Sequence, residues 1–175
     1  AVVDLLDWFQ GQISDDRLIA GTSLYARRVG QAIASPLLHL HSRFDAPGVA
    51  AISADAFATP ALAVLAGGVL RSLTPSLYGS RKTGLPHVPV ASGGWSIAAG
   101  STPLGDLLRG VTRGVLVGRF SMGMPSPGGD FSGVVKNSFL IEDGQVGTAL
   151  SGVMAAGNMA RMLEAHGKPF RVAGH

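Results

Sequence analysis

The stretch Asn137-Ser-Phe-Leu-Ile-Glu-Asp-Gly-Gln-Val-Gly-Thr-Ala-Leu150 decides the fold class of this 175-residue chain. Two runs rich in apolar residues flank Asp143-Gly144, a dipeptide that readily takes the left-handed backbone of a two-residue turn. The stretch therefore predicts an antiparallel hairpin made of strands 137–142 and 145–150.

A second hairpin is predicted in the middle of the chain. The runs Ala61–Ala66 and Val69–Leu73 flank Gly67-Gly68, and two glycines can supply the positive φ that a tight turn requires at both central positions. Pro75 is expected to end the second strand. Further strands are predicted at 37–41, at 114–121 and, near the end of the chain, at 169–173.

Three short helices are predicted beside these hairpins. The first covers residues 2–13, where one face is apolar. The second, Leu104–Arg109, follows Thr102-Pro103 as N-cap and first helical residue and stops at Gly110; the third follows Asn158 as N-cap and stops at Gly167. The apolar positions are Val2, Leu5, Leu6, Phe9 and Ile13 in the first helix and Met159, Met162 and Leu163 in the third. Hairpins without a sustained βαβ rhythm predict an α+β fold built on antiparallel sheets.

The overall composition fits one folded domain over residues 1–175. Hydrophobic residues make up 46% of the chain and charged residues only 14%, while 25 Gly and 10 Pro indicate many turns. The first residue is not Met and already lies in a helical pattern, so we expect the chain to begin inside a longer protein.

Charge and cysteine content argue against several classes of protein. The basic pairs Arg27-Arg28 and Arg81-Lys82 are isolated, whereas nucleic-acid binding usually needs a basic cluster on one face. Apolar runs such as Ala61–Ala66 are far shorter than the ~20 residues of a membrane-spanning helix. With no cysteine, the chain has neither disulfides nor thiolate metal ligands. We expect a cytoplasmic protein without nucleic-acid or membrane partners.

Several motifs together resemble the C-terminal domain of the TldD/PmbA family. The main ones are Gly128-Gly-Asp-Phe-Ser-Gly133, Ser138-Phe-Leu-Ile-Glu-Asp-Gly144 and Val153-Met-Ala-Ala-Gly-Asn158, in this order and spacing. Upstream, Gly67-Gly-Val-Leu70 and Tyr78-Gly-Ser-Arg-Lys-Thr-Gly84 resemble the central hairpin of the family and the segment after it. The resemblance extends from about Leu24 to Leu163.

This resemblance implies a two-lobed protein whose second lobe is the present chain. In the family, TldD is a zinc metallopeptidase that pairs with an inactive PmbA (TldE) subunit and trims unfolded peptides. Its zinc is held by a helical His-Glu-x-x-x-His and a later Cys, and such a site needs neutral imidazoles or a thiolate together with an open position for water.

The zinc motif is degenerate in this chain. Counting back from Gly21-Thr-Ser23 without gaps, the motif falls on Leu6-Asp-Trp-Phe-Gln-Gly11. Leu6 and Gly11 then stand at the two His positions and Asp7 at the Glu position, and with the adjacent Gln10 they are the four positions at which the motif is degenerate. No His occurs between Ala1 and Ala20. The resemblance therefore implies a member closer to the non-catalytic PmbA branch, with no metal or catalytic residue of its own and zinc expected only in an active partner.

A candidate binding surface is predicted around the Gly-Gly-Asp-Phe-Ser-Gly motif. It follows the Pro/Gly-rich loop 122–129, and exposed loops often carry function. A simpler reading is a tight turn in which the Asp130 side chain accepts hydrogen bonds from backbone amides. Strand 114–121 could also pair with an extended peptide if it is a sheet edge, although an interior strand is the commoner fate of such a run. The candidate peptide- or partner-binding residues are Gly129, Asp130, Phe131, Ser132, Gly133 and Arg119.

The remaining polar candidates have simpler explanations. His39 and His41 could share one face of a strand, but no third metal ligand is near in sequence. His166 fits a helix C-terminus, where a cation is favourable. His87, in the predicted loop 84–94, and His175 have no visible partner. Ser132 and Asp130 could form a triad with a histidine, but no nucleophile-elbow pattern surrounds Ser132.

Three functions remain open at this point. The first is a non-catalytic subunit that binds unfolded peptide or pairs with a TldD-like subunit or with itself. The second is an enzyme whose ligands come from a missing lobe or from His39 and His41. The third is a structural dimerisation module that has no substrate.

Overall fold

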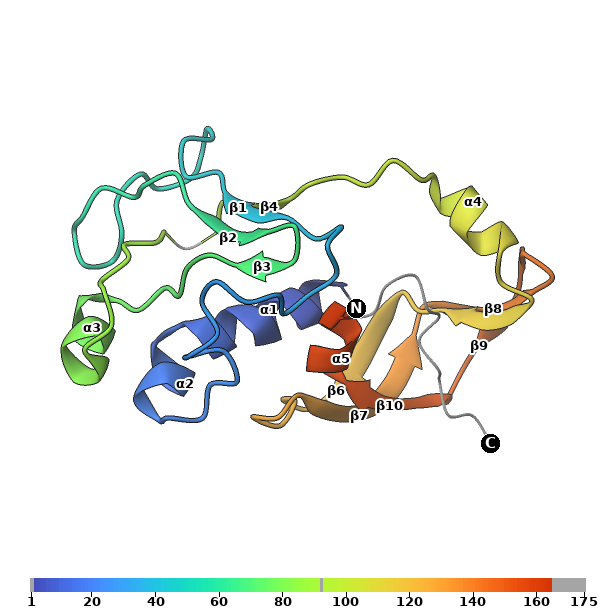
Figure 1. Cartoon of the computed structure of the whole chain (residues 1–175). Coiled ribbons are helices and arrows are strands. Elements are labelled where there is room, and N and C mark those ends of the chain that lie inside the picture. The colour runs from blue at the N-terminus through green and yellow to red at the C-terminus, as the bar shows by residue number, and fades with distance from the viewer. Residues whose placement is uncertain (1, 92, 165–175) are drawn as a thin grey trace. The chain divides into compact units, whose positions relative to one another are not determined.

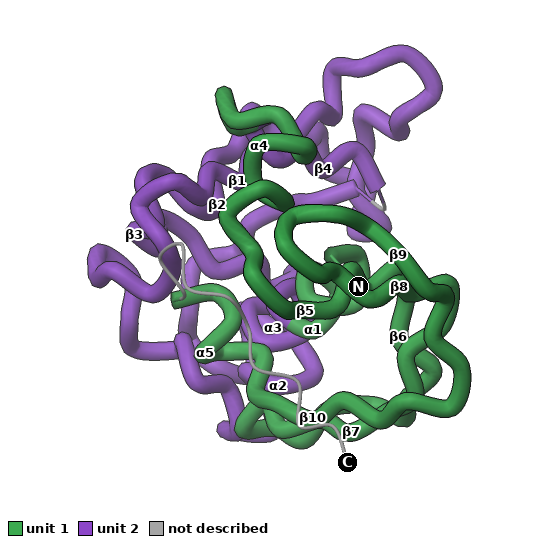
Figure 2. The backbone as a smooth tube through the Cα atoms, turned by 90° about the vertical axis from the view of Figure 1, so that its right-hand side faces the viewer, with its two compact units in different colours: residues 1–8, 100–175 green, residues 9–99 purple. Residues whose placement is uncertain are grey.

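The computed structural model describes residues 2–91 and 93–164, and the chain divides into two compact units (Figure 2). Unit 1 comprises residues 1–8 and 100–175, and unit 2 comprises residues 9–99. The boundary falls inside the first helix. The expectation of one domain over the whole chain stays a prediction.

The described residues form five helices and ten strands (Figure 1). Antiparallel pairing accounts for every strand contact, so the predicted α+β class is confirmed. None of the helices in the described part of the chain has the length and apolarity needed to cross a membrane. The helices are α1 (Val2–Ile13), α2 (Asp15–Ile19), α3 (Leu77–Thr83), α4 (Leu104–Arg109) and α5 (Met159–Glu164). The strands are β1 (Leu40–Ser42), β2 (Ala63–Ala66), β3 (Val69–Leu70), β4 (Trp95–Ile97), β5 (Arg113–Leu116), β6 (Arg119–Met122), β7 (Asp130–Lys136), β8 (Ser138–Glu142), β9 (Gln145–Leu150) and β10 (Met154–Asn158).

Unit 2 is built on a four-stranded sheet in the order β3-β2-β1-β4. Consecutive residues of β2, Val64 and Leu65, are both buried, so this strand is covered on both faces. The end of α1 contributes Phe9 and Ile13 to the same core, and Phe9 meets the ring of Tyr25 edge-on at 5.6 Å between centroids.

The β2–β3 hairpin confirms the Gly-Gly prediction. Gly67 and Gly68 have φ of +58° and +73°. The second strand is shorter than the predicted 69–73, since it ends at Leu70. After Leu70 the chain hydrogen-bonds to the end of α1 instead, since both the amide and the hydroxyl of Thr74 donate to the carbonyl of Ile13.

Strand β1 begins later than predicted. The expected start at Leu37 is wrong because Ser35–Leu38 form a turn, in which the amide of Leu38 donates to the carbonyl of Ser35 at 2.9 Å. Regular pairing begins at Leu40, which faces Leu65 on one side and Ile97 on the other.

Unit 1 contains two three-stranded sheets, in the orders β10-β7-β6 and β5-β8-β9. The predicted hairpin around Asp143-Gly144 is confirmed as β8–β9, with φ of +47° and +77° at the two turn residues. In strand β7 every second residue is buried and the residues between them are exposed, or half-buried at Val134, which is the pattern of a sheet with one face in water.

The prediction of a single strand at 114–121 is wrong. This segment forms two strands, β5 and β6, which belong to different sheets. The partner segment changes direction at Asn137, which has a φ of +48°, so β5 follows β8 while β6 follows β7. Gly118 lies at the break and leaves no space for a side chain next to the carbonyl of Asn137. Both β5 and β6 lie at the edge of their sheets, which is the position that pairing with an extended peptide would need.

The helix predictions are confirmed where the structure describes them. Helix α1 has the predicted bounds, although Val2 is exposed. Helix α4 also matches, but Pro103 rather than Thr102 is its N-cap. Asn158 caps α5, since its Oδ1 accepts from the amide of Arg161 at 3.1 Å, and Met159 and Leu163 are buried. The predicted stop at Gly167, the strand at 169–173, His166 and His175 lie outside the described residues.

Candidate functional site

The candidate surface lies on the exposed face of the sheet β10-β7-β6 in unit 1. Alternation along β7 turns Asp130, Ser132, Val134 and Lys136 to this face, while the residues between them face the core. The neighbouring strands continue the face, with Asn158 opposite Asp130 and Arg119 opposite Lys136. We refer to the exposed members of these three strands as the β7 face: Arg119, Ser121, Asp130, Ser132, Val134, Lys136, Met154, Ala156 and Asn158.

The β7 face is polarised along the strand direction. Arg119 and Lys136 lie side by side at one end, and neither makes an ion pair with the described residues. Asp130 lies at the other end, six residues along β7, which is about 20 Å at 3.3 Å per residue. The predicted residues Arg119 and Asp130 therefore share a face but do not converge on one point.

Half of the predicted contact residues are structural. Phe131 is buried and lies 5.2 Å from the ring of Phe120, measured between centroids. Gly133 is buried and leaves no room for a side chain against Met122. Gly129 is also buried, with a φ of +92° and the ring of Trp8 where a Cβ would lie. These three residues shape the surface from behind, and Asp130, Ser132 and Arg119 are exposed on it.

The turn before β7 is held by Ser126 rather than by Asp130. The Oγ of Ser126 accepts from the amide of Asp130 at 3.0 Å, and its carbonyl accepts from the amide of Gly129 at 2.9 Å. The carboxylate of Asp130 instead accepts from the side-chain amide of Asn158 at 2.9 Å. The reading in which Asp130 satisfies backbone amides is wrong, because this carboxylate joins β7 to the N-terminus of α5.

Two residues that the apolar stripe missed fix helix α1. Trp8 is buried and donates from Nε1 to the carbonyl of Ser126 at 3.3 Å, which ties the turn before β7 to the helix. Gln12 is fully buried, and its Oε1 accepts from the amide of Leu24 at 2.9 Å. Their spacing of four residues was a detectable signal, since it places both side chains on one face of a helix.

The four motif positions on α1 face partly outward. Leu6, Gln10 and Gly11 are half-buried, and Asp7 is exposed. A Cβ added at Gly11 would have open space around it. The only ionisable group among the four is the Asp7 carboxylate.

The histidines do not assemble into a site within the described residues. His39 Nδ1 accepts from the amide of Gly67 at 3.3 Å, so this imidazole supports the β2–β3 turn. Within residues 2–91 and 93–164, no group of three or more His, Cys, Asp or Glu is placed to hold a metal. Ser132 lies opposite Ala156, and the described part of unit 1 contains no histidine that could complete a triad.

His87 lies beside a carboxylate, although its buried Nε2 makes no hydrogen bond with the described residues. Its Nε2 lies 3.4 Å from Oδ2 of Asp55, whose carboxylate also accepts from the amide of Leu77 at 2.9 Å. Asp15 accepts from the amide of Ser76 at 2.9 Å and from its hydroxyl at 2.5 Å. Both carboxylates thus serve the first residues of α3, where negative charge is favourable.

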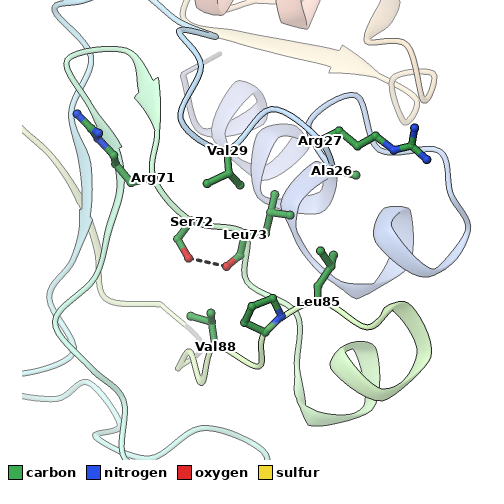
Figure 3. Close-up of a pocket in the computed structure, with 9 residues that line it drawn as sticks. Ala26, Arg27, Val29, Arg71, Ser72, Leu73, Leu85 and Val88 are labelled. Carbon is green, nitrogen blue, oxygen red and sulfur yellow. Dashed lines mark hydrogen bonds between the residues drawn. The ribbon is translucent and has the colours of Figure 1, made fainter.

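A pocket in unit 2 was missed by the sequence reasoning. Its volume is about 420 Å³, and Figure 3 shows side chains from three separate segments gathered around it. Each segment is irregular, so no periodic pattern marked the pocket in advance. The lining residues are Ala26, Arg27 and Val29 from the first segment, Arg71, Ser72 and Leu73 from the second, and Leu85, Pro86 and Val88 from the third.

Comparison with known proteins identifies the family. The family model described as the PmbA/TldA metallopeptidase C-terminal domain matches residues 1–168. The chain belongs to the PmbA/TldD family. No curated protein is significantly similar to it.

Solved structures of PmbA/TldD relatives share the fold. A candidate modulator of DNA gyrase from Bacteroides thetaiotaomicron is 26% identical, with a TM-score of 0.81 over 91% of this chain and 37% of its own. A candidate modulator of DNA gyrase from Thermotoga maritima is 22% identical, with a TM-score of 0.80 over 94% of this chain and 41% of its own. TldE from Thermococcus kodakarensis is 22% identical, with a TM-score of 0.74 over 90% and 40%. The chain thus spans about two fifths of the length of these proteins.

The residues at the positions predicted for the PmbA/TldD zinc motif do not fit zinc. Structural and catalytic zinc sites use imidazole, thiolate and carboxylate ligands, usually three or four of them. Here the four positions offer one exposed carboxylate, an amide, an apolar side chain and a glycine. We therefore derive no metal-dependent step for α1.

Proposed function

We propose that this chain is a non-catalytic member of the PmbA/TldD family that contributes peptide or partner binding to a peptidase assembly. The single observation that carries the proposal is that residues 1–20 contain no His, so that the positions predicted for the zinc motif on α1 hold Leu6, Asp7, Gln10 and Gly11 instead. The helix itself is retained and tied to the turn before β7 through Trp8. The scaffold that would present a metal is therefore kept without the ligands.

The proposed contact surface is the β7 face. It is an open sheet face bearing a cationic end at Arg119 and Lys136, a carboxylate at Asp130 and a hydroxyl at Ser132 between them. Hydrogen-bonding groups and both signs of charge suit contact with a peptide or with another subunit. The proposed partners are unfolded peptide and a TldD-like subunit or a second copy of this protein, with zinc expected only in an active partner. A cytoplasmic location belongs to the same proposal.

The catalytic part of the proposal is tested by metal content and peptide cleavage. We expect the complete purified protein to contain no stoichiometric zinc and to cleave unfolded peptides only when a subunit carrying His-Glu-x-x-x-His is added. Stoichiometric zinc that a chelator removes, together with loss of cleavage by the protein alone, would refute the proposal.

The binding part is tested by photo-crosslinking. A benzoylphenylalanine at Ser132 should crosslink to an added unfolded peptide or to the co-purified partner subunit. The matched control places the same group at Thr112, which is exposed in the same unit but lies outside the β7 face. Equal crosslinking at both positions, or none at Ser132, would exclude the β7 face as the contact surface.

A further inference from the structure

The pocket of unit 2 has an apolar interior that is open to the surface. Its volume of about 420 Å³ lies within the roughly 300–1,000 Å³ of small-ligand sites. Val29, half of whose surface is exposed, stands at its edge, and Leu73 is buried at its base. Figure 3 shows Val29, Leu85 and Val88 directed toward the same space. An aliphatic side chain entering here would remove apolar surface from water on both partners.

Two unpaired arginines stand on opposite sides of this pocket, with their guanidinium groups directed outward from its interior (Figure 3). The guanidinium groups of Arg27 and Arg71 make no ion pair or hydrogen bond with the described residues, and both side chains are exposed. Unit 2 contains seven Arg and Lys against four Asp. Two of these four, Asp15 and Asp55, are engaged at the start of α3. The field around the pocket therefore favours an acidic ligand.

The main chain beside the pocket is also available. The amide of Gly30 donates to the carbonyl of Leu70, and the amide of Leu70 donates to the carbonyl of Gln31. These bonds occupy the outer edge of β3 as far as Leu70. Past that point, the amide and carbonyl of Ser72 make no hydrogen bond within the described residues, and its hydroxyl donates to the carbonyl of Leu73. A ligand with backbone amide groups would find both a donor and an acceptor there.

We propose that this pocket binds an extended acidic peptide segment, with one aliphatic side chain in the apolar interior and an acidic residue two positions away on each side directed to Arg27 and Arg71. The inference rests on the proposed function in peptide binding. It adds that the bound peptide should be acidic and carry one aliphatic residue. It places that preference in unit 2, apart from the β7 face, so each surface can be tested without the other.

The test measures fluorescence polarisation of three labelled peptides with the complete protein. The probes are Gly-Glu-Gly-Leu-Gly-Glu-Gly, Gly-Lys-Gly-Leu-Gly-Lys-Gly and Gly-Glu-Gly-Ser-Gly-Glu-Gly, in which the charged residues share the face of the central residue when the peptide is extended. We expect the first to bind about tenfold or more tightly than either of the others, since one loses charge complementarity and the other loses the apolar side chain.

Charge reversal at the pocket provides the decisive variant. Arg27→Glu with Arg71→Glu should reverse the preference, so that the lysine-flanked peptide binds more tightly than the glutamate-flanked one. A gain of binding cannot result from misfolding. The matched control, Arg43→Glu with Arg81→Glu, makes the same change of charge at exposed residues of unit 2 that do not line the pocket, and it should leave the preference unchanged.

Two results would overturn this inference. One is equal binding of all three peptides or of none, and the other is an unchanged preference in the Arg27/Arg71 variant. Crosslinking of an unfolded peptide at Ser132 would still support the proposed function in either case. Absence of that crosslink with retained preference for the glutamate-flanked peptide would instead reject the β7 face and keep the pocket.

Discussion

The sheet β3-β2-β1-β4 of unit 2 and the sheet β10-β7-β6 of unit 1 use the same antiparallel pairing but are buried differently. In β2 two consecutive residues, Val64 and Leu65, are inaccessible, whereas in β7 burial alternates with every residue. A strand covered on both faces has no free face for a partner, and the candidate site of unit 2 is formed by irregular segments instead. A sheet covered on one face can use its other face directly, as proposed for β7.

The largest effect is expected from the buried side of β7. Phe131→Ala should lower the free energy of unfolding of unit 1 by about 3–5 kcal/mol, because a large ring is removed from contact with Phe120. The neighbouring Ser132→Ala should change it by less than about 0.5 kcal/mol. Urea denaturation in a Trp95→Phe background reports on unit 1, since the chain has two tryptophans and Trp8 is the one in this unit. Comparable losses at both positions would contradict the alternation.

Neighbouring substitutions in β2 should behave differently. Val64→Ala and Leu65→Ala should each lower the free energy of unfolding of unit 2 by about 2–4 kcal/mol, because both side chains are buried. The exposed Ala63→Ser is the control and should be nearly neutral. Trp95 fluorescence in a Trp8→Phe background follows this unit. A large loss at only one of the two buried positions would mean that β2 has an open face after all.

A smaller effect tests how the β7 face is joined to α5. Asn158→Ala removes the N-cap of α5 and the bonds from the side-chain amide to Gly128 and Asp130, so we expect a loss of about 1–2 kcal/mol in unit 1. Asn158→Ser keeps a capping oxygen and should recover part of this loss. If serine is no better than alanine, the cap contributes nothing and the bond to Asp130 carries the effect.

The smallest effect is expected at the exposed strand β9. Val146 is 44% exposed, and the first five residues of this edge strand are all open to solvent. Val146→Lys should therefore change the free energy of unfolding of unit 1 by less than about 0.5 kcal/mol. A loss above about 2 kcal/mol in urea denaturation would mean that β9 is covered in the complete protein. Strand β9 would then no longer serve as an example of an exposed strand.

What the sequence predicts well is local. The turn geometry at Gly67-Gly68 and at Asp143-Gly144 depends on two residues each. The cap at Asn158 depends on a hydrogen bond to an amide only three residues further along the chain. The break between β5 and β6 could not be predicted in this way, because it follows from the change of direction at Asn137, about twenty residues further along the chain.

The candidate site was predicted only in part, for two physical reasons. Residues 128–133 were interpreted as a tight turn, so the period of two that separates Asp130 and Ser132 from Phe131 and Gly133 was not applied. The pocket of unit 2 depends on three segments without regular structure that tertiary folding brings together. Neither the spacing nor the composition of any one segment contains that information.

The boundary inside α1 has a consequence for the order in which the protein is made. Unit 2 is continuous from residue 9 to residue 99, whereas unit 1 joins residues 1–8 to a segment that begins at residue 100. During synthesis, unit 2 has its whole chain available while Trp8 still lacks Ser126, the acceptor of its indole proton. The indole of Trp8, which is buried in the folded protein, therefore stays without this acceptor until the turn before β7 leaves the ribosome. A chaperone that binds exposed apolar side chains would be expected to bind this chain during that interval.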